Sequence, residues 1–215
     1  MLEIKHKRTQ AVLKAMDADT LQGMKMSGVQ LRGANLAGAN LAGADLISCD
    51  LRDADLQDAN LTGALLNGAY LNGANLVRAN LTGANLTDAQ LQHAELQEAT
   101  LVRANLRYAQ LQDALLCGAD LSAADLSMAD LRADFHGAKL TRADLRASDL
   151  TGANLRSVDL QEANLTGAKM HTAQMAGAKT YGMIDVAGRR VAYGNTNARG
   201  KKSALRPWWK FWAQA

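Results

Sequence analysis

The sequence repeats every five residues over most of its length, and this period limits the possible folds more than any other feature. The unit reads Ala-Asp/Asn-Leu followed by two polar or glycine residues, with central residues at Met26, Leu31 and every fifth position to Leu131. After one four-residue step, the centres resume at Phe135 and continue to Met175. Leucine occupies 27 of these 31 centres, so the chain is a repeat protein rather than a conventional globular domain.

A period of five matches neither an α-helix nor an uninterrupted strand, whose side chains recur every 3.6 and 2 residues. It fits a short extended segment followed by a turn, in which the alanine and the central leucine point to the same side. Repeated turns would stack the chain into coils about 4.8 Å apart. The low aromatic content of 4% agrees with a regular interior of small aliphatic side chains.

These A(D/N)LxG units resemble the pentapeptide-repeat proteins, a largely bacterial family, over about 70% of the chain. The resemblance implies an all-β fold, a right-handed quadrilateral β-helix with four units in each coil. Thirty-one units would give about eight coils and a rod of roughly 37 Å. The four-residue step before Phe135 departs from the pattern. We interpret it as a tightened corner in which Phe135 fills the stack; a kink that shapes a binding face is the alternative.

The flanking segments predict a division into an N-terminal cap (1–23), the β-helix (24–177), a C-terminal cap (178–194) and a basic tail (195–215). Both ends of a solenoid expose strand edges and the apolar lumen, so caps are expected. Residues 2–18 alternate on both sides of Arg8-Thr9-Gln10, which predicts a β-hairpin, with a helix over 10–16 as the alternative. Residues 181–194 predict a second hairpin.

The tail contains four of the nine aromatic residues and follows the single proline, Pro207. Three interpretations stay open: a lid or dimer contact on the solenoid, a tail with no fixed role, and an anchor to an anionic membrane or a partner. The lid favours a homodimer joined through the C-terminal ends. The candidate tail contacts are Leu205, Trp208, Trp209, Phe211 and Trp212.

The net charge of +3 conceals an acidic body, because residues 1–25 carry +2, residues 26–175 carry −6 and residues 176–215 carry +7. The chain has no run of about 18 apolar residues, and its first residues lack the apolar core of a secretory signal. With only two cysteines, Cys49 and Cys117, a disulfide-dense scaffold is excluded, and we expect a cytoplasmic location.

We expect no enzymatic activity. The four histidines have no cysteine or carboxylate at metal-ligand spacing, and a lumen packed with alanine and leucine leaves no space for a substrate. We therefore expect no catalytic residue, no metal and no cofactor. Any function would lie on the outer surface.

The 20-residue coil places Asp55 and Asp58 at the same two positions as Glu95 and Glu98, two coils later. The candidate acidic face, with its neighbours on the preceding face, is Asp50, Asp53, Asp55, Asp58, Glu95, Glu98 and Asp134. Carboxylates about 10 Å apart along a rod could imitate DNA phosphates, and the resemblance to gyrase-protecting family members implies such mimicry. This sequence departs from those members because its centres are leucine, it has no looped insertion, and Arg78 and Arg156 interrupt the face.

Two main hypotheses follow: a non-enzymatic scaffold that binds an unknown protein partner, and a DNA-mimicking modulator of DNA gyrase or another type II topoisomerase. A third, weaker hypothesis is a peripheral membrane protein held by the tail. We expect no direct nucleic-acid binding by the solenoid. The simplest alternative for the acidic residues is a solvated face that keeps the rod soluble.

Overall fold

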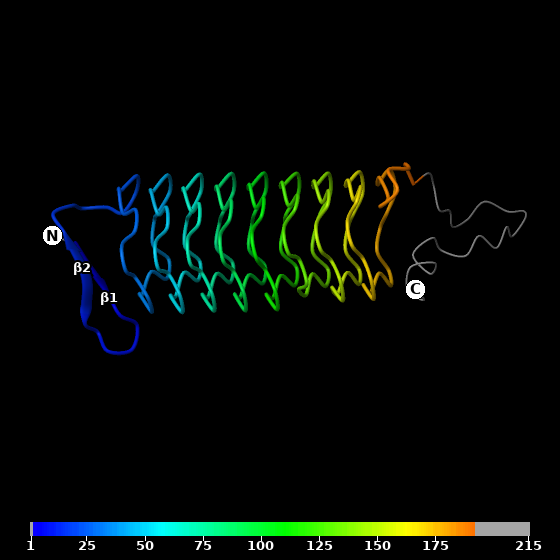
Figure 1. Cartoon of the computed structure of the whole chain (residues 1–215). Helices are drawn as coiled ribbons and strands as arrows, with labels where there is room; N and C mark the ends of the chain where they lie inside the picture. Colours follow the sequence, from blue (N-terminus) through cyan, green and yellow to red (C-terminus); the bar gives the residue numbers. More distant parts are fainter. Residues whose placement is uncertain (1, 192–215) are drawn as a thin grey trace, which may run out of the picture.

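The computed structural model describes residues 2–191, which form a rod of stacked coils with a hairpin at the N-terminal end (Figure 1). In the hairpin, strand β1 (Leu2–Lys5) pairs antiparallel with strand β2 (Val12–Met16). Beyond it the chain turns after every short extended segment, so each unit contributes a single bridging residue instead of a long strand. No helix among residues 2–191 is long or apolar enough to cross a lipid bilayer.

Four ladders of parallel backbone bridges hold the coils together, one on each side of the rod, and they begin at Lys25, Gln30, Asn35 and Asn40. Most steps along a ladder span 20 residues, so four five-residue units make one coil. The backbone N–H of Leu86, for example, donates to the carbonyl oxygen of Asn105 in the next coil at 2.7 Å. These bonds satisfy backbone groups that would otherwise face water at the edge of each coil.

The lumen is filled by the alanine and the central leucine of each unit, as the alternation within the extended segment predicts. Leu86 and Ala84 are both 0% exposed, and the other units in the middle of the rod are equally buried. Each fully buried leucine contributes roughly 1.5–3 kcal/mol to stability before the cost of ordering the chain. The interior is thus dry and regular, and the outer side chains are free to differ between coils.

The four-residue step is absorbed at a single corner without breaking the ladders. The Ala133 N–H donates to the Leu131 carbonyl at 2.8 Å, which closes a shorter turn than elsewhere. On either side the bridges continue, with Leu115 paired to Asp134 over 19 residues. Phe135 is 0% exposed and occupies the lumen immediately after the shortened corner.

The last residue of most units turns the corner with a backbone φ in the left-handed region. Glycine is favoured there because it has no Cβ to clash with the backbone. Several corners nevertheless carry other residues, among them Tyr108 (φ 60°) and Ala123 (φ 57°). The backbone is strained at these corners, and the hydrogen bonds of the ladders on both sides compensate for the cost in free energy.

The two ends of the rod are finished differently. The hairpin joins the first coil through the Lys7 N–H, which donates to Gly33 O at 2.8 Å. At the other end, the parallel ladder continues past residue 177 to Ile184, and the chain then reverses, so that Val191 N–H donates to Met183 O at 2.7 Å. The predicted tail contacts from Leu205 to Trp212 lie outside the described residues.

Candidate interaction surface

One side of the rod gathers most of the acidic residues that the sequence singled out. We call it the Asp55 face; its ladder runs through Asn35, Asp55, Asn75, Glu95, Leu115, Asp134, Asn154 and Gln174. Three of the candidate carboxylates, Asp55, Glu95 and Asp134, lie on this ladder. They occur at every second coil, because Asn75 and Leu115 stand between them.

Asp58 and Glu98 lie at the corner of the same face, with Arg78 between them in the intervening coil. The Arg78 guanidinium donates to both carboxylate oxygens of Asp58, at 2.8 and 2.7 Å. These hydrogen bonds hold the pKa of Asp58 below its usual value. The charge of Asp58 is therefore compensated by Arg78.

Asp50 and Asp53 lie on the neighbouring face and are also compensated. Asp50 is only 5% exposed and accepts two hydrogen bonds from Arg52, at 2.8 and 2.6 Å, which lower its pKa. Asp53 pairs with Arg32 at 3.0 Å. Neither carboxylate extends an uncompensated acidic surface onto this side of the rod.

The pairing of Asp50 with Arg52 follows from a local sequence signal, the tripeptide Asp-Leu-Arg. Its aspartate and arginine flank an inward leucine, so both point outward on the same face and meet. The same arrangement joins Asp130 to Arg132 and Asp144 to Arg146, at 2.6 and 2.5 Å. A count of acidic residues along a face that ignores these arginines overestimates the negative charge of the face.

Four carboxylates of the Asp55 face keep their charge uncompensated by any ion pair within residues 2–191: Asp55, Glu95, Glu98 and Asp134. Asparagines of the adjoining coils donate to two of them, Asn75 to Asp55 at 3.0 Å and Asn154 to Asp134 at 2.9 Å. An amide donor orients a carboxylate without neutralising it. This face is the most negative side of the described rod.

An exposed leucine stands within this acidic ladder. Leu115 is 39% exposed and lies between Glu95 and Asp134, at a position usually occupied by a polar residue. Next to it, the missing corner residue leaves an open hollow of about 580 Å³, lined in part by Asp113, Leu115, Arg132 and Asp134. Sequence reasoning missed Leu115, although a leucine at the outward position of the repeat was a visible signal.

The nearby thiol of Cys117 offers no reactive nucleophile. Burial raises its pKa, and the neighbouring Asp134 carboxylate raises it further. A thiol with a raised pKa is largely protonated and unreactive at neutral pH. Within residues 2–191, no cluster of three or more histidine, cysteine, aspartate or glutamate side chains is placed to hold a metal ion.

Comparison with known proteins agrees with the five-residue repeat. The family model described as pentapeptide repeats matches eight copies, over residues 25–63, 64–101, 99–133 and 133–171. No curated protein sequence matches the chain.

Solved structures of pentapeptide-repeat proteins are similar to this chain. HetL, a protein involved in the regulation of heterocyst differentiation in the cyanobacterium Nostoc sp. strain PCC 7120, is 31% identical, with coverage of 79% of this chain and 92% of its own and a TM-score of 0.33. Trypsin-treated QnrB1, a plasmid-mediated fluoroquinolone resistance protein, is 20% identical, with coverage of 73% and 79% and a TM-score of 0.44. A thylakoid-lumen pentapeptide-repeat protein of Arabidopsis thaliana is 27% identical, with coverage of 63% and 71% and a TM-score of 0.26.

Proposed function

This chain belongs to the pentapeptide-repeat family, and we propose that it is a non-enzymatic scaffold that binds a protein partner through the Asp55 face. The observation that carries the proposal is the exposed Leu115 in a ladder whose carboxylates form no ion pair within residues 2–191. Protein interfaces commonly combine an apolar anchor with a charged rim. The filled lumen leaves the outer surface as the place where binding would occur.

The chemistry of this face selects the kind of partner. An apolar side chain would pack on Leu115, while lysine or arginine residues beside it would meet Glu95 and Asp134. The complementary partner is therefore a protein surface that is basic around an exposed apolar residue. Charge complementarity of this kind raises the association rate and weakens with added salt.

Retention of partners by immobilised full-length protein tests the proposal. The test variant carries Leu115→Ser and Glu95→Gln. The matched control carries Leu65→Ser and Asp88→Asn, because Leu65 is equally exposed, at 40%, and belongs to another ladder. We expect wild type and control to retain the same basic protein, released by salt, and the test variant to lose it. Equal retention by both variants would place the binding surface elsewhere.

A second candidate function is modulation of a type II topoisomerase by DNA mimicry. It is favoured by the recurrence of Asp55, Glu95 and Asp134 at two-coil steps, about 10 Å apart, along one straight ladder. The pairing of Asp58 with Arg78 reduces this resemblance to a phosphate track, which makes the protein scaffold the better supported function.

A DNA gyrase supercoiling assay separates the two candidates. Mimicry predicts inhibition by micromolar wild-type protein and its loss in a variant with amides at the four uncompensated carboxylates of the Asp55 face. The control is Asp88→Asn on another side of the rod. Unchanged supercoiling with wild-type protein would exclude mimicry and leave the scaffold function intact.

Association with membranes through the tail is a weaker candidate. Its support is the sequence alone, where Trp208, Trp209 and Trp212 stand beside basic residues. Sedimentation with anionic liposomes, with and without residues 201–215, tests it. Equal pelleting of the two forms would rule out the tail as an anchor.

A further inference from the structure

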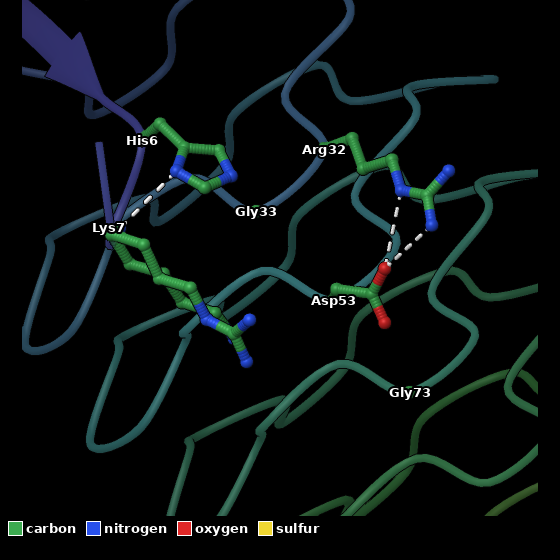
Figure 2. Close-up of a pocket in the computed structure, with 7 residues that line it drawn as sticks. His6, Lys7, Arg32, Gly33, Asp53 and Gly73 are labelled. Atoms are coloured by element: carbon green, nitrogen blue, oxygen red, sulfur yellow. Dashed lines mark hydrogen bonds and ion pairs between the residues drawn. The ribbon is translucent and has the colours of Figure 1, made fainter. Parts of the chain in front are cut away.

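A groove of about 690 Å³ lies where the N-terminal hairpin overhangs the first coils. It is lined by His6, Lys7, Arg8, Arg32, Gly33, Asp53 and Gly73 (Figure 2). The hairpin loop forms one wall and is fixed by the Lys7 N–H, which donates to Gly33 O at 2.8 Å. The groove is therefore a joint product of the cap and the solenoid.

Glycine keeps the floor of this groove open. Gly33 and Gly73 occupy corners on either side of Asp53, so a side chain projects from only one of three successive corners. The His6 ring lies over Gly33, where a Cβ would come within 2.5 Å of His6 Nε2. Because His6 Nδ1 accepts from the N–H groups of Arg8 and Thr9, the neutral ring carries its proton on Nε2, on the side of Gly33.

Two cations of the groove are not compensated by a carboxylate within residues 2–191. Most lysine and arginine side chains within residues 2–191 pair with a carboxylate of the same or an adjoining coil, as Arg142 does with Glu162 at 2.7 Å. Lys7 and Arg8 have no ion pair in the described part of the chain, and they line the same groove. Two adjacent uncompensated cations repel each other unless an anion lies between them.

Arg32 is the third cation of the groove, and some of its N–H donors are not engaged by Asp53. Its Nε and Nη2 both donate to Asp53 Oδ2, at 3.1 and 3.0 Å, while Nη1 has no acceptor within residues 2–191 (Figure 2). Three cations against the single carboxylate of Asp53 leave the groove positive, on a rod whose body is acidic. A positive groove with several N–H donors suits an anion that offers several acceptor oxygens.

We propose that this groove binds a phosphate monoester. A phosphate dianion presents three acceptor oxygens, which match the several N–H donors that Lys7, Arg8 and Arg32 offer along this groove. A carboxylate offers only two oxygens and a single charge. The volume lies within the range of small-molecule sites and leaves room for the group that carries the phosphate.

Calorimetric titration of the full-length protein at low salt, with inorganic phosphate, AMP and O-phosphoserine as probes, tests the site. We expect binding of phosphate that weakens with salt, and roughly a tenfold or greater loss of affinity in the Lys7→Gln/Arg8→Gln variant, since charge-assisted hydrogen bonds are lost. We expect Asp53→Asn to bind several-fold more tightly, because it removes the repelling carboxylate and frees Arg32. Tighter binding of AMP or of phosphoserine would identify the carrier of the phosphate.

Two controls separate this site from nonspecific attraction, and the second of them removes the same charge as the test variant. Arg103→Gln removes one unpaired cation on a different part of the rod, and Lys201→Gln/Lys202→Gln removes two from the basic tail. Both controls should bind phosphate as the wild type does. Absence of binding by wild type at millimolar phosphate, or an equal loss in either control, would overturn the proposal. Circular dichroism of each variant confirms that the coils are intact.

Discussion

Ala123 and Ala124 are adjacent and chemically identical, yet the fold predicts opposite effects for the same substitution. Ala123 turns a corner with φ at 57° and its methyl group faces solvent. Ala124 lies in the lumen and is 1% exposed. Replacing each by glycine therefore tests the assignment of corner and lumen positions with no change of charge or polarity.

The magnitudes follow from the two environments. At Ala123, glycine removes the left-handed backbone penalty, which stabilises the fold by about 1–2 kcal/mol. Its greater entropy in the unfolded chain destabilises the fold by about 0.5–1 kcal/mol, so the net gain in stability is roughly 0.5–1 kcal/mol. At Ala124, glycine removes a buried methyl worth about 0.8 kcal/mol and adds the same entropy, a net loss of roughly 1.5 kcal/mol. The two variants should differ by about 2 kcal/mol.

Thermal and guanidinium unfolding of the two variants measure this difference. For a chain of this size, about 2 kcal/mol corresponds to a separation of roughly 4–8 °C between the two melting temperatures, with Ala123→Gly above wild type and Ala124→Gly below it. Neighbouring coils stabilise one another, so the unfolding transition should stay cooperative. Equal destabilisation of both variants would show that residue 123 does not occupy a left-handed corner, and would refute the reasoning.

Three further predictions address the lumen, the ion pairs and the assembly. Leu86→Asp places a carboxylate where residue 86 is 0% exposed, and we expect loss of the folded circular-dichroism signal; a melting temperature within a degree or two of wild type would contradict the inward assignment. Because Arg52 lowers the pKa of Asp50, the pair stabilises the folded protein at neutral pH, and this contribution is lost as pH falls below about 4. Between pH 7 and 2, the free energy of unfolding should therefore decrease less for Asp50→Asn than for wild type. Equal decreases would argue against a stabilising pair. Light scattering of the full chain and of a truncation after Gly200 should report a dimer and a monomer; a full chain that is monomeric at high micromolar concentration would exclude the C-terminal dimer.

The coil architecture was predictable because the same residue types recur at each equivalent position of the repeat, and so indicate many times over which positions are buried and which turn the corner. Alanine and leucine recur at inward positions, and glycine recurs at the corner, so one short unit specifies the lumen and the turn together. The bridge from Leu115 to Asp134 shows that even the shortened unit keeps this register. The sequence did not predict how far the ladder extends at the C-terminal end, because Ile184 follows units whose centres are no longer leucine.

The candidate surface was less predictable because each charge on this rod can be paired in two directions. One partner can lie in the same five-residue unit, and the other can lie in the coil above or below. A register of 20 residues correctly brings Asp55, Glu95 and Asp134 onto one ladder. It does not reveal that Asp50 is buried against Arg52, since this pair forms within one unit across the intervening leucine. To predict the net charge of a face, one therefore needs both the stacking register and the side-chain pairing within each unit.

The same two directions decide whether a charge on this rod is compensated. Glu95 has no lysine or arginine in its own unit, and its neighbours on the ladder are Asn75 and Leu115. It therefore forms no ion pair within residues 2–191. Lys7 and Arg8 lie in the hairpin loop, outside the repeat, and the loop contacts the first coil through the bridge from His6 to Ala34. Neither cation has an ion pair within residues 2–191. On a rod whose other charges mostly neutralise one another locally, these two places can attract ligands of opposite sign: a basic protein surface at the Asp55 face and an anion at the hairpin groove.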